Sequence, residues 1–122
     1  MNNEHPLTAL QFGAGNIGRG LVGAILAQAG YKVIFADVID DLVNQINSRG
    51  EYTVHVLDIN SYDIPVKGVS AVNSAGAEAV AKVSEADIIT TAVGLRILKF
   101  VAPAIAKGIV ARKEAGNAKP LN

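Results

Sequence analysis

Cysteine is absent from this chain of 122 residues. Its absence excludes disulfides, thiolate metal sites and cysteine nucleophiles, and it fits a reducing compartment. Net charge is absent too, because 11 basic residues balance 11 acidic ones. Without a basic excess there is no general electrostatic attraction to phosphate-rich surfaces. The composition therefore argues against a binder of nucleic acid or of anionic membranes.

Long hydrophobic runs are also missing. No stretch approaches the roughly 18 apolar residues of a membrane span, and the polar N-terminus lacks a signal-peptide pattern. We therefore expect a cytoplasmic protein that binds no membrane. Aromatic residues make up only 5% of the chain, whereas apolar residues reach 50%. This aliphatic composition is typical of a buried parallel sheet covered by helices, within one domain.

The first fifty residues predict strand, glycine-rich turn, helix, strand and helix. The strands are expected at 7–12 and 32–36. Between them, a helix is predicted over 17–29, with a buried face of apolar residues three and four positions apart: Leu21, Val22, Ile25 and Ala29. Asp40 is expected to cap the second helix, which should end near Gly50.

The second half predicts a hairpin, two further parallel strands and a long helix. Residues 52–57 alternate as in a half-exposed strand, and 63–67 return antiparallel. Buried strands are expected at 69–72 and 86–93, with a short helix between them. A final helix over 95–113 should be interrupted or restart at a proline, Pro103. Basic residues on or beside this helix are expected to form a solvated face: Arg96, Lys99, Lys107, Arg112 and Lys113.

The strongest local signal is a G-x-G-x-x-G motif, Gly13-Ala14-Gly15-Asn16-Ile17-Gly18. It follows a predicted strand and opens a predicted helix. Asp37 lies 19 residues after Gly18, at the end of the second strand. Together these features predict a dinucleotide site in a Rossmann-type fold. The predicted fold class is therefore α/β, a doubly wound parallel sheet of order 3-2-1-4, truncated, with an inserted antiparallel hairpin.

Each residue type in the motif has a physical reason. Gly13 permits a tight turn, Gly15 lets the backbone approach a pyrophosphate, and Gly18 lets the helix pack closely on the sheet. Free N–H groups at the helix start attract phosphate. The carboxylate of Asp37 would accept hydrogen bonds from ribose hydroxyls and repel a 2′-phosphate, which favours NAD over NADP. The alternative is a glycine-rich packing turn with Asp37 as a cap.

Two further segments extend the predicted site. Arg19 could reach a phosphate of the cofactor or of the substrate; the alternative is a solvated side chain. The turn after the last parallel strand lies where such sheets bind ligands; the alternative is a plain turn after a core strand. The predicted cofactor-binding residues are Phe12, Gly13, Ala14, Gly15, Asn16, Ile17, Gly18, Arg19, Asp37, Ala92, Val93 and Gly94. No catalytic or metal-binding residue is assigned, and neither of the two histidines, His5 and His55, is expected to be catalytic.

Several segments resemble the polyol-specific long-chain dehydrogenases. They are FGAGNIGRG at 12–20, FADV at 35–38, EYTVHV at 51–56, TTAVG at 90–94 and VAPAIAKGIVARKEAGN at 101–117. The resemblance extends from about residue 7 to residue 122. It implies an NAD-binding domain of enzymes that interconvert mannitol 1-phosphate and fructose 6-phosphate without zinc, so that a sugar or polyol phosphate is the expected partner.

The resemblance also implies a further domain. In those enzymes a mostly helical domain supplies a general-base lysine in a K-x4-N-x2-H pattern, and this sequence contains no such pattern. We therefore expect residues 1–122 to be a truncated NAD-binding domain without the helical catalytic domain. We expect this chain to be inactive alone. It should self-associate through the uncovered edge of the last strand.

Two other functions compete with this interpretation. Regulatory nucleotide-sensing modules, such as the cytoplasmic gating domains of potassium transport systems, have similar length and the same glycine motif. The inserted hairpin argues against them. Another dehydrogenase with the same nucleotide-binding half, such as a ketopantoate-type reductase, is the third possibility.

Overall fold

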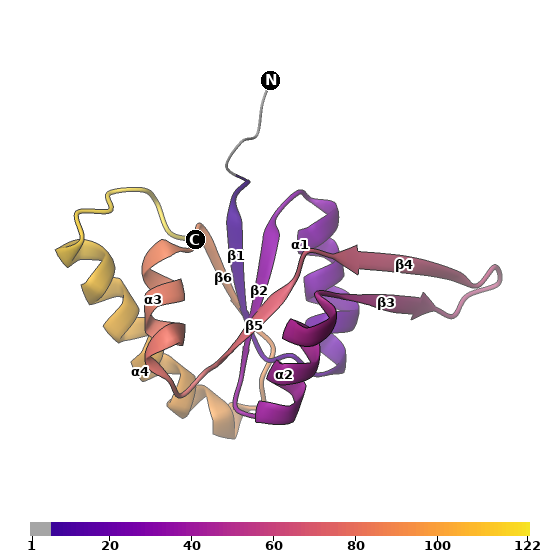
Figure 1. The fold of residues 1–122 in the computed structure, drawn as a ribbon, viewed down its shortest axis with the longest axis horizontal. Coiled ribbons are helices and arrows are strands. Elements are labelled where there is room, and N and C mark those ends of the chain that lie inside the picture. The colour runs from indigo at the N-terminus through magenta and orange to yellow at the C-terminus, as the bar shows by residue number, and fades with distance from the viewer. Residues whose placement is uncertain (1–5) are drawn as a thin grey trace.

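The computed structural model describes residues 6–122, so that His5 lies outside the described residues. The fold is α/β, with four parallel strands and a separate antiparallel hairpin (Figure 1). The strands of the main sheet, in spatial order, are β5 (Ser70–Asn73), β2 (Lys32–Asp37), β1 (Thr8–Phe12) and β6 (Ile88–Thr91). This arrangement confirms the predicted Rossmann-type sheet and its strand order.

Helices cover both faces of the sheet because successive strand residues point to opposite sides. On one face Val33 and Phe35 pack against the helix after the glycine loop, against α2 (Asp40–Arg49) and against the base of the hairpin. On the other face Leu10 and Phe12 pack against α3 (Ala77–Glu85) and α4 (Leu95–Glu114). Among residues 6–122, no helix is long and apolar enough to cross a membrane.

The helix after the glycine loop differs from the predicted one. It contains a π-helical segment, η1 (Gly18–Gly23), followed by α1 (Ala24–Gln28). Leu21 and Ile25 of the predicted buried face are 56% and 55% exposed, whereas Leu26 is buried. Of the four predicted residues only Val22 packs against the core, so most of the predicted face is wrong. A π turn holds one more residue than an α turn, so the residues beyond it are rotated by roughly 100° from their α-helical positions.

Close packing accompanies this π turn. The hydroxyl of Tyr52 donates a hydrogen bond of 2.7 Å to the carbonyl oxygen of Arg19, within η1. A side chain inserted at a helix carbonyl is one of the known causes of helix irregularity. A Cβ atom on Gly23 would lie 2.6 Å from the Tyr52 hydroxyl oxygen and 2.7 Å from Cζ of Phe35. Glycine at this position therefore lets the hairpin and the sheet approach the helix.

Helix α2 ends as predicted but begins differently. Gly50 closes it in the left-handed conformation, with φ of 66°. Asp40 is not the cap, because it is the first residue of the helix and its Oδ1 accepts a hydrogen bond of 2.8 Å from Nδ2 of Asn73. The preceding residue, Ile39, donates its N–H to Asp37 instead.

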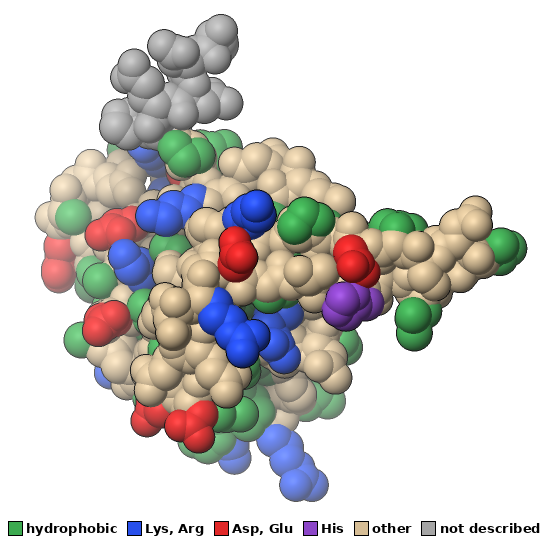
Figure 2. Space-filling model, turned by 45° about the vertical axis from the view of Figure 1, so that its right-hand side comes forward, with side chains coloured by type: hydrophobic (Ala, Val, Ile, Leu, Met, Phe, Trp, Pro, Cys, Tyr) green, Lys and Arg blue, Asp and Glu red, His purple; other side chains and the backbone are tan. Residues whose placement is uncertain are grey.

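The predicted hairpin is present, formed by β3 (Glu51–Val56) and β4 (Tyr62–Lys67). It projects from the body of the protein beside α1 (Figure 1). Its connecting turn exposes Leu57 and Ile59 by 88% and 97%, and green apolar side chains lie at the projecting end in Figure 2. At its base Val66 is fully enclosed in the core.

Helix α4 corrects two predictions. Pro103 does not interrupt it, because this residue lies on the exposed side, where solvent can pair the carbonyl that loses its N–H partner. Arg112 is not solvated: it is only 5% exposed and donates hydrogen bonds to the carbonyl oxygens of Ser84 at 2.9 Å and Ala86 at 2.7 Å. It also donates to the C-terminal segment at Lys119. Its long side chain therefore joins α4 to the turn before β6.

The outer edge of β6 is partly paired. The N–H of Ile89 donates to the carbonyl oxygen of Asn122 at 2.7 Å, and the N–H of Asn122 donates to the carbonyl oxygen of Asp87 at 3.2 Å. Alternating bonds of this kind are those of a parallel strand pair. The edge that the sequence predicted to be uncovered thus has a partner at its amino end.

Candidate nucleotide-binding site

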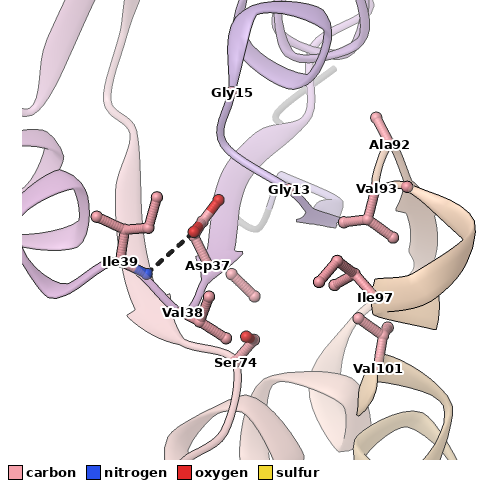
Figure 3. Close-up of a pocket in the computed structure, with 12 residues that line it drawn as sticks. Gly13, Gly15, Asp37, Val38, Ile39, Ser74, Ala92, Val93, Ile97 and Val101 are labelled. Carbon is pink, nitrogen blue, oxygen red and sulfur yellow. Dashed lines mark hydrogen bonds between the residues drawn. The ribbon is translucent and has the colours of Figure 1, made fainter. Parts of the chain in front are cut away.

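A hollow of about 300 Å³ lies at the carboxyl ends of the parallel strands (Figure 3). Ligands of open α/β sheets bind at this edge. The lining comes from the glycine loop, the ends of β2, β5 and β6, and the first turns of α4. The lining residues are Gly13, Gly15, Ala36, Asp37, Val38, Ile39, Ser74, Ala92, Val93, Gly94, Ile97 and Val101.

Two glycines of the motif are required by the protein itself. Gly13 has φ of 100°, a conformation that favours glycine, and its N–H donates to the carbonyl oxygen of Ala36 at 2.8 Å. A Cβ atom on Gly13 would overlap the carbonyl oxygen of Ala92. A Cβ atom on Gly18 would overlap the carbonyl oxygen of Gly13. These two positions fix the tight turn between β1 and the helix.

Gly15 is different, because apart from its own neighbours in the chain no protein atom lies within 4 Å of the position that its Cβ would take. Packing within the described chain therefore gives no reason for glycine here. The open space adjoins the first turn of the helix, whose N–H groups have no acceptor within the helix. A pyrophosphate could approach the backbone at this point, as the motif predicts.

Asp37 joins the glycine loop to the end of β2. Its Oδ2 accepts a hydrogen bond of 2.8 Å from the N–H of Ala14, and its Oδ1 accepts one of 3.0 Å from the N–H of Ile39. A carboxylate can accept about four hydrogen bonds. Asp37 thus supports the loop, the role of the alternative interpretation, and still has acceptor capacity facing the hollow (Figure 3).

The walls of the hollow are mainly apolar. Val38, Ile39 and Ser74 lie on one side, and Val93, Ile97 and Val101 lie on the other (Figure 3). Besides Ala36, five lining residues lie outside the predicted site: Val38, Ile39, Ser74, Ile97 and Val101. The sequence signal for Val38 and Ile39 is their position directly after Asp37, and the signal for Ser74 is its position directly after β5. The last two are one helical turn apart on α4, which only the packing of α4 against the sheet brings to the site.

Residues 7–122 match the family model of the mannitol dehydrogenase Rossmann domain. The chain belongs to the mannitol dehydrogenase family. The predicted resemblance is thereby confirmed, and the fold described above is that of the Rossmann domain of an oxidoreductase family.

Other predicted site residues of this mannitol dehydrogenase domain lie around the hollow rather than in its lining. Phe12, Ala14 and Gly18 are buried behind the loop, whereas Asn16 and Ile17 are exposed at the helix start. Such positions fit the backbone contacts that the motif predicts for the helix start. Among residues 6–122, no group of three or more histidine, aspartate or glutamate side chains could hold a metal ion.

Arg19 faces the hairpin instead. It lines a separate hollow of about 300 Å³ together with Tyr52 and His55. Its Nε is buried without a hydrogen-bond partner in the described chain. Burial raises the pKa of the Tyr52 phenol to about 12, and the charge of Arg19 acts in the opposite direction. The predicted contact between Arg19 and a phosphate stays a prediction, and this position of the side chain does not favour it.

Proposed function

We propose that the chain binds NAD as the nucleotide-binding part of a dehydrogenase that interconverts mannitol 1-phosphate and fructose 6-phosphate. The observation that supports this most is that the open space at Gly15 and the carboxylate of Asp37 line the same hollow. The first fits a pyrophosphate and the second fits the hydroxyls of the adenosine ribose. The family match supports an oxidoreductase over a nucleotide sensor.

The chemistry would be hydride transfer between the nicotinamide and C2 of fructose 6-phosphate. In this proposal the residues of the chain bind and orient the cofactor. Free N–H groups at the start of the helix would hold the pyrophosphate, and Asp37 would hold the ribose. Ala92, Val93 and Gly94 at the end of β6 would border the nicotinamide side.

A comparison of NADH and NADPH tests this proposal. Asp37→Ala should weaken NADH binding by roughly 10- to 150-fold. This corresponds to about 1.5–3 kcal/mol for the loss of a charged hydrogen-bond acceptor. The same change also removes the bonds to Ala14 and Ile39, which affects both cofactors. The decisive value is therefore the ratio of the two dissociation constants from calorimetry, in which the shared loss cancels. We expect wild type to prefer NADH and Asp37→Ala to lose that preference.

Asp41→Ala is the matched control, since it removes an exposed carboxylate of α2 that does not line the hollow. It should leave the ratio unchanged. Equal affinity of wild type for NADH and NADPH would contradict the role of Asp37. Absence of any NADH binding would contradict the proposed function as a whole.

We further propose that these 122 residues bind the cofactor without turnover. The resemblance places the general-base lysine in a K-x4-N-x2-H pattern that the sequence does not contain, and hydride transfer to a carbonyl needs a positioned proton donor. Fructose 6-phosphate and NADH should therefore give no change in absorbance at the NADH band. Sustained oxidation of NADH by the purified chain would overturn this part of the proposal.

Self-association and a cytoplasmic location remain proposals. The pairing of Asn122 with β6 reduces the unpaired strand edge, but α4 exposes Leu95 and Phe100 by 87% and 63%. Exposed apolar surface of this kind favours association. Sedimentation equilibrium at rising concentration tests it, and a monomer throughout would refute it. Fractionation of cells tests the location, for which the cysteine-free composition is the support.

A further inference from the structure

Gln11 is a fully buried polar residue in the centre of the parallel sheet. It lies on β1 between Phe35 of β2 and Thr90 of β6, its partners in register. Burial of an amide is unfavourable unless its donors and acceptor are paired. The dinucleotide motif begins only two residues later and does not require glutamine at this position.

All polar groups of the Gln11 amide are paired. Its Nε2 donates to the carbonyl oxygens of Phe12 at 2.9 Å and Gly13 at 3.2 Å. Its Oε1 accepts a hydrogen bond from the hydroxyl of Thr90. Because both partners of Nε2 are acceptors, only the amide nitrogen can occupy that position.

The carbonyl of Gly13 depends on this amide. It lies so close to Gly18 that a Cβ atom there would overlap it, and Nε2 of Gln11 lies 3.2 Å from the same position. The carbonyl is thus enclosed by the helix start. A buried carbonyl without a donor carries a desolvation cost, so that loss of the Gln11 amide would favour a shifted glycine turn.

The amide also joins the two sides of the site. The carbonyl oxygen of Phe12, which accepts from Gln11, also accepts a hydrogen bond of 2.8 Å from the N–H of Ala92. Thr90 lies on β6, two residues before Ala92. One side chain therefore connects the turn that contains Gly13 with the strand end that leads to Ala92.

We propose that Gln11 is a positioning residue that holds the glycine turn in register with the end of β6. This inference rests on the proposed function, because the turn is the proposed pyrophosphate contact and the end of β6 borders the proposed nicotinamide side. Gln11 is not among the residues that line the hollow. It acts through the carbonyl groups of Phe12 and Gly13 and the hydroxyl of Thr90.

Gln11→Met tests the inference first, since methionine is similar in size and lacks the amide. Measured by calorimetry below the unfolding range, NADH should bind about tenfold more weakly or worse, the effect expected when a buried hydrogen-bonding partner is lost. Leu10→Val is the matched control on the same strand. It lowers stability through the core on the other face of the sheet and should leave the NADH affinity unchanged.

Thr90→Val separates the two halves of the connection. It removes only the bond between Thr90 and Gln11. NADH spans both sides of the site, whereas ADP carries only the adenosine and the pyrophosphate. We expect NADH to bind several-fold more weakly, roughly the effect of one lost hydrogen bond, with ADP unchanged. A merely structural role would shift the melting temperature and leave the ratio of the two affinities constant.

Gln11→Glu supplies a readout that packing alone does not produce. A protonated carboxyl can still donate to one of the two carbonyl oxygens, but a carboxylate cannot. Burial among carbonyl groups disfavours the charged form and raises the pKa of a carboxyl group. NADH binding by Gln11→Glu should therefore weaken as pH rises through that raised pKa, relative to wild type.

The inference fails if Gln11→Met, Thr90→Val and Gln11→Glu all bind NADH as wild type does at every pH. It also fails if NADH and ADP weaken equally in Thr90→Val. A wild-type chain that binds neither ligand would instead refute the proposed function, so that the two failures are distinguishable. If Gln11→Met does not fold, the ratio from Thr90→Val decides.

Discussion

The two ends of the parallel sheet use their polar groups in opposite ways. At the amino end, Oδ2 of Asp87 accepts the N–H of Thr8 at 2.8 Å, and Arg112 pairs the carbonyls of Ser84 and Ala86. The polar groups there close the structure. At the carboxyl end, Asp37 also accepts backbone N–H groups, but it lines a hollow beside the open position of Gly15.

This contrast supports the proposed binding end without reference to any ligand. At both ends an aspartate carboxylate accepts a hydrogen bond from a backbone N–H group of another segment. Such a hydrogen bond therefore does not by itself indicate function. Empty space alone does not distinguish the ends, because Arg112 borders a hollow of about 370 Å³ at the amino end. The difference is the unused acceptor capacity of Asp37, which faces a hollow beside the open backbone at Gly15. Where the chain folds tightly around its polar groups we expect effects on stability, and where it leaves them open we expect effects on binding.

The largest effect expected at the carboxyl end comes from Gly15→Val. Its side chain would fill the space proposed for the pyrophosphate, so NADH affinity should fall by more than about 100-fold, beyond the resolution of ordinary titration. Because no protein atom lies near this position, the circular dichroism spectrum and melting temperature should stay close to wild type. Fluorescence titration with NADH measures the affinity, and thermal unfolding followed by circular dichroism measures the melting temperature.

Gly18→Val is the matched comparison within the same motif. Its side chain would overlap the carbonyl oxygen of Gly13, so that it should lower the melting temperature sharply or prevent folding. Equal stability of the two variants would break the distinction between an open glycine and an enclosed one. NADH binding by Gly15→Val as tight as that of wild type would refute the pyrophosphate contact.

A smaller effect, on stability alone, is expected at the amino end from Arg112→Met. Methionine fills the space of the stem but leaves buried carbonyls unpaired, which should cost about 2–4 kcal/mol in the free energy of unfolding. The NADH affinity of the folded variant should equal that of wild type. Lys113→Met is the control, since Lys113 is exposed on the same helix. Urea unfolding and NADH titration test both statements, and a loss of affinity in Arg112→Met would break the separation between the two ends.

The sequence predicts the arrangement of this fold well because its signals are local. The glycine motif, the strand runs and Gly50 each act within a few residues, and they place the parallel strands and the hairpin in the correct order. The last parallel strand is shorter and less buried than the predicted strand over 86–93, since β6 spans only Ile88–Thr91. The predicted buried face of the first helix is wrong because the helix contains a π turn. The side chain that bonds to this turn, Tyr52, lies more than thirty residues away in the sequence. Arg112 is misjudged for a similar reason, since its carbonyl partners lie on the turn before β6.

The residues of the candidate site also divide into those that local sequence signals predict and those that depend on distant packing. Gly13, Gly15 and Asp37 follow from motif spacing, and the structure brings them to one hollow. Ile97 and Val101 do not follow from spacing, because only the crossing of α4 under the sheet end places them there. Arg19 adjoins the motif in sequence, but its side chain turns toward the hairpin. Sequence proximity to a motif thus predicts the backbone contacts better than the direction of a side chain.

The smallest effect is expected from Tyr52→Phe. This substitution tests whether a polar group beside the helix after the glycine loop contributes to stability or to NADH binding. The Tyr52 hydroxyl donates to Arg19 within η1 and lines no part of the hollow at the strand ends. Its loss should cost about 1 kcal/mol in the free energy of unfolding near neutral pH and leave NADH affinity unchanged.

Burial raises the pKa of Tyr52 to about 12 in the folded chain, against about 10 in an unfolded one. Between these values the unfolded chain loses the phenol proton first, so the stability of wild type falls as pH rises through this range. Tyr52→Phe should lack that contribution, and its stability should approach or exceed that of wild type at the alkaline end. Tyr62→Phe, on the exposed part of the hairpin, is the control for a general loss of a phenol. Urea unfolding at several pH values measures the difference, and a parallel pH dependence of wild type and Tyr52→Phe would show that this hydroxyl is not held in the fold.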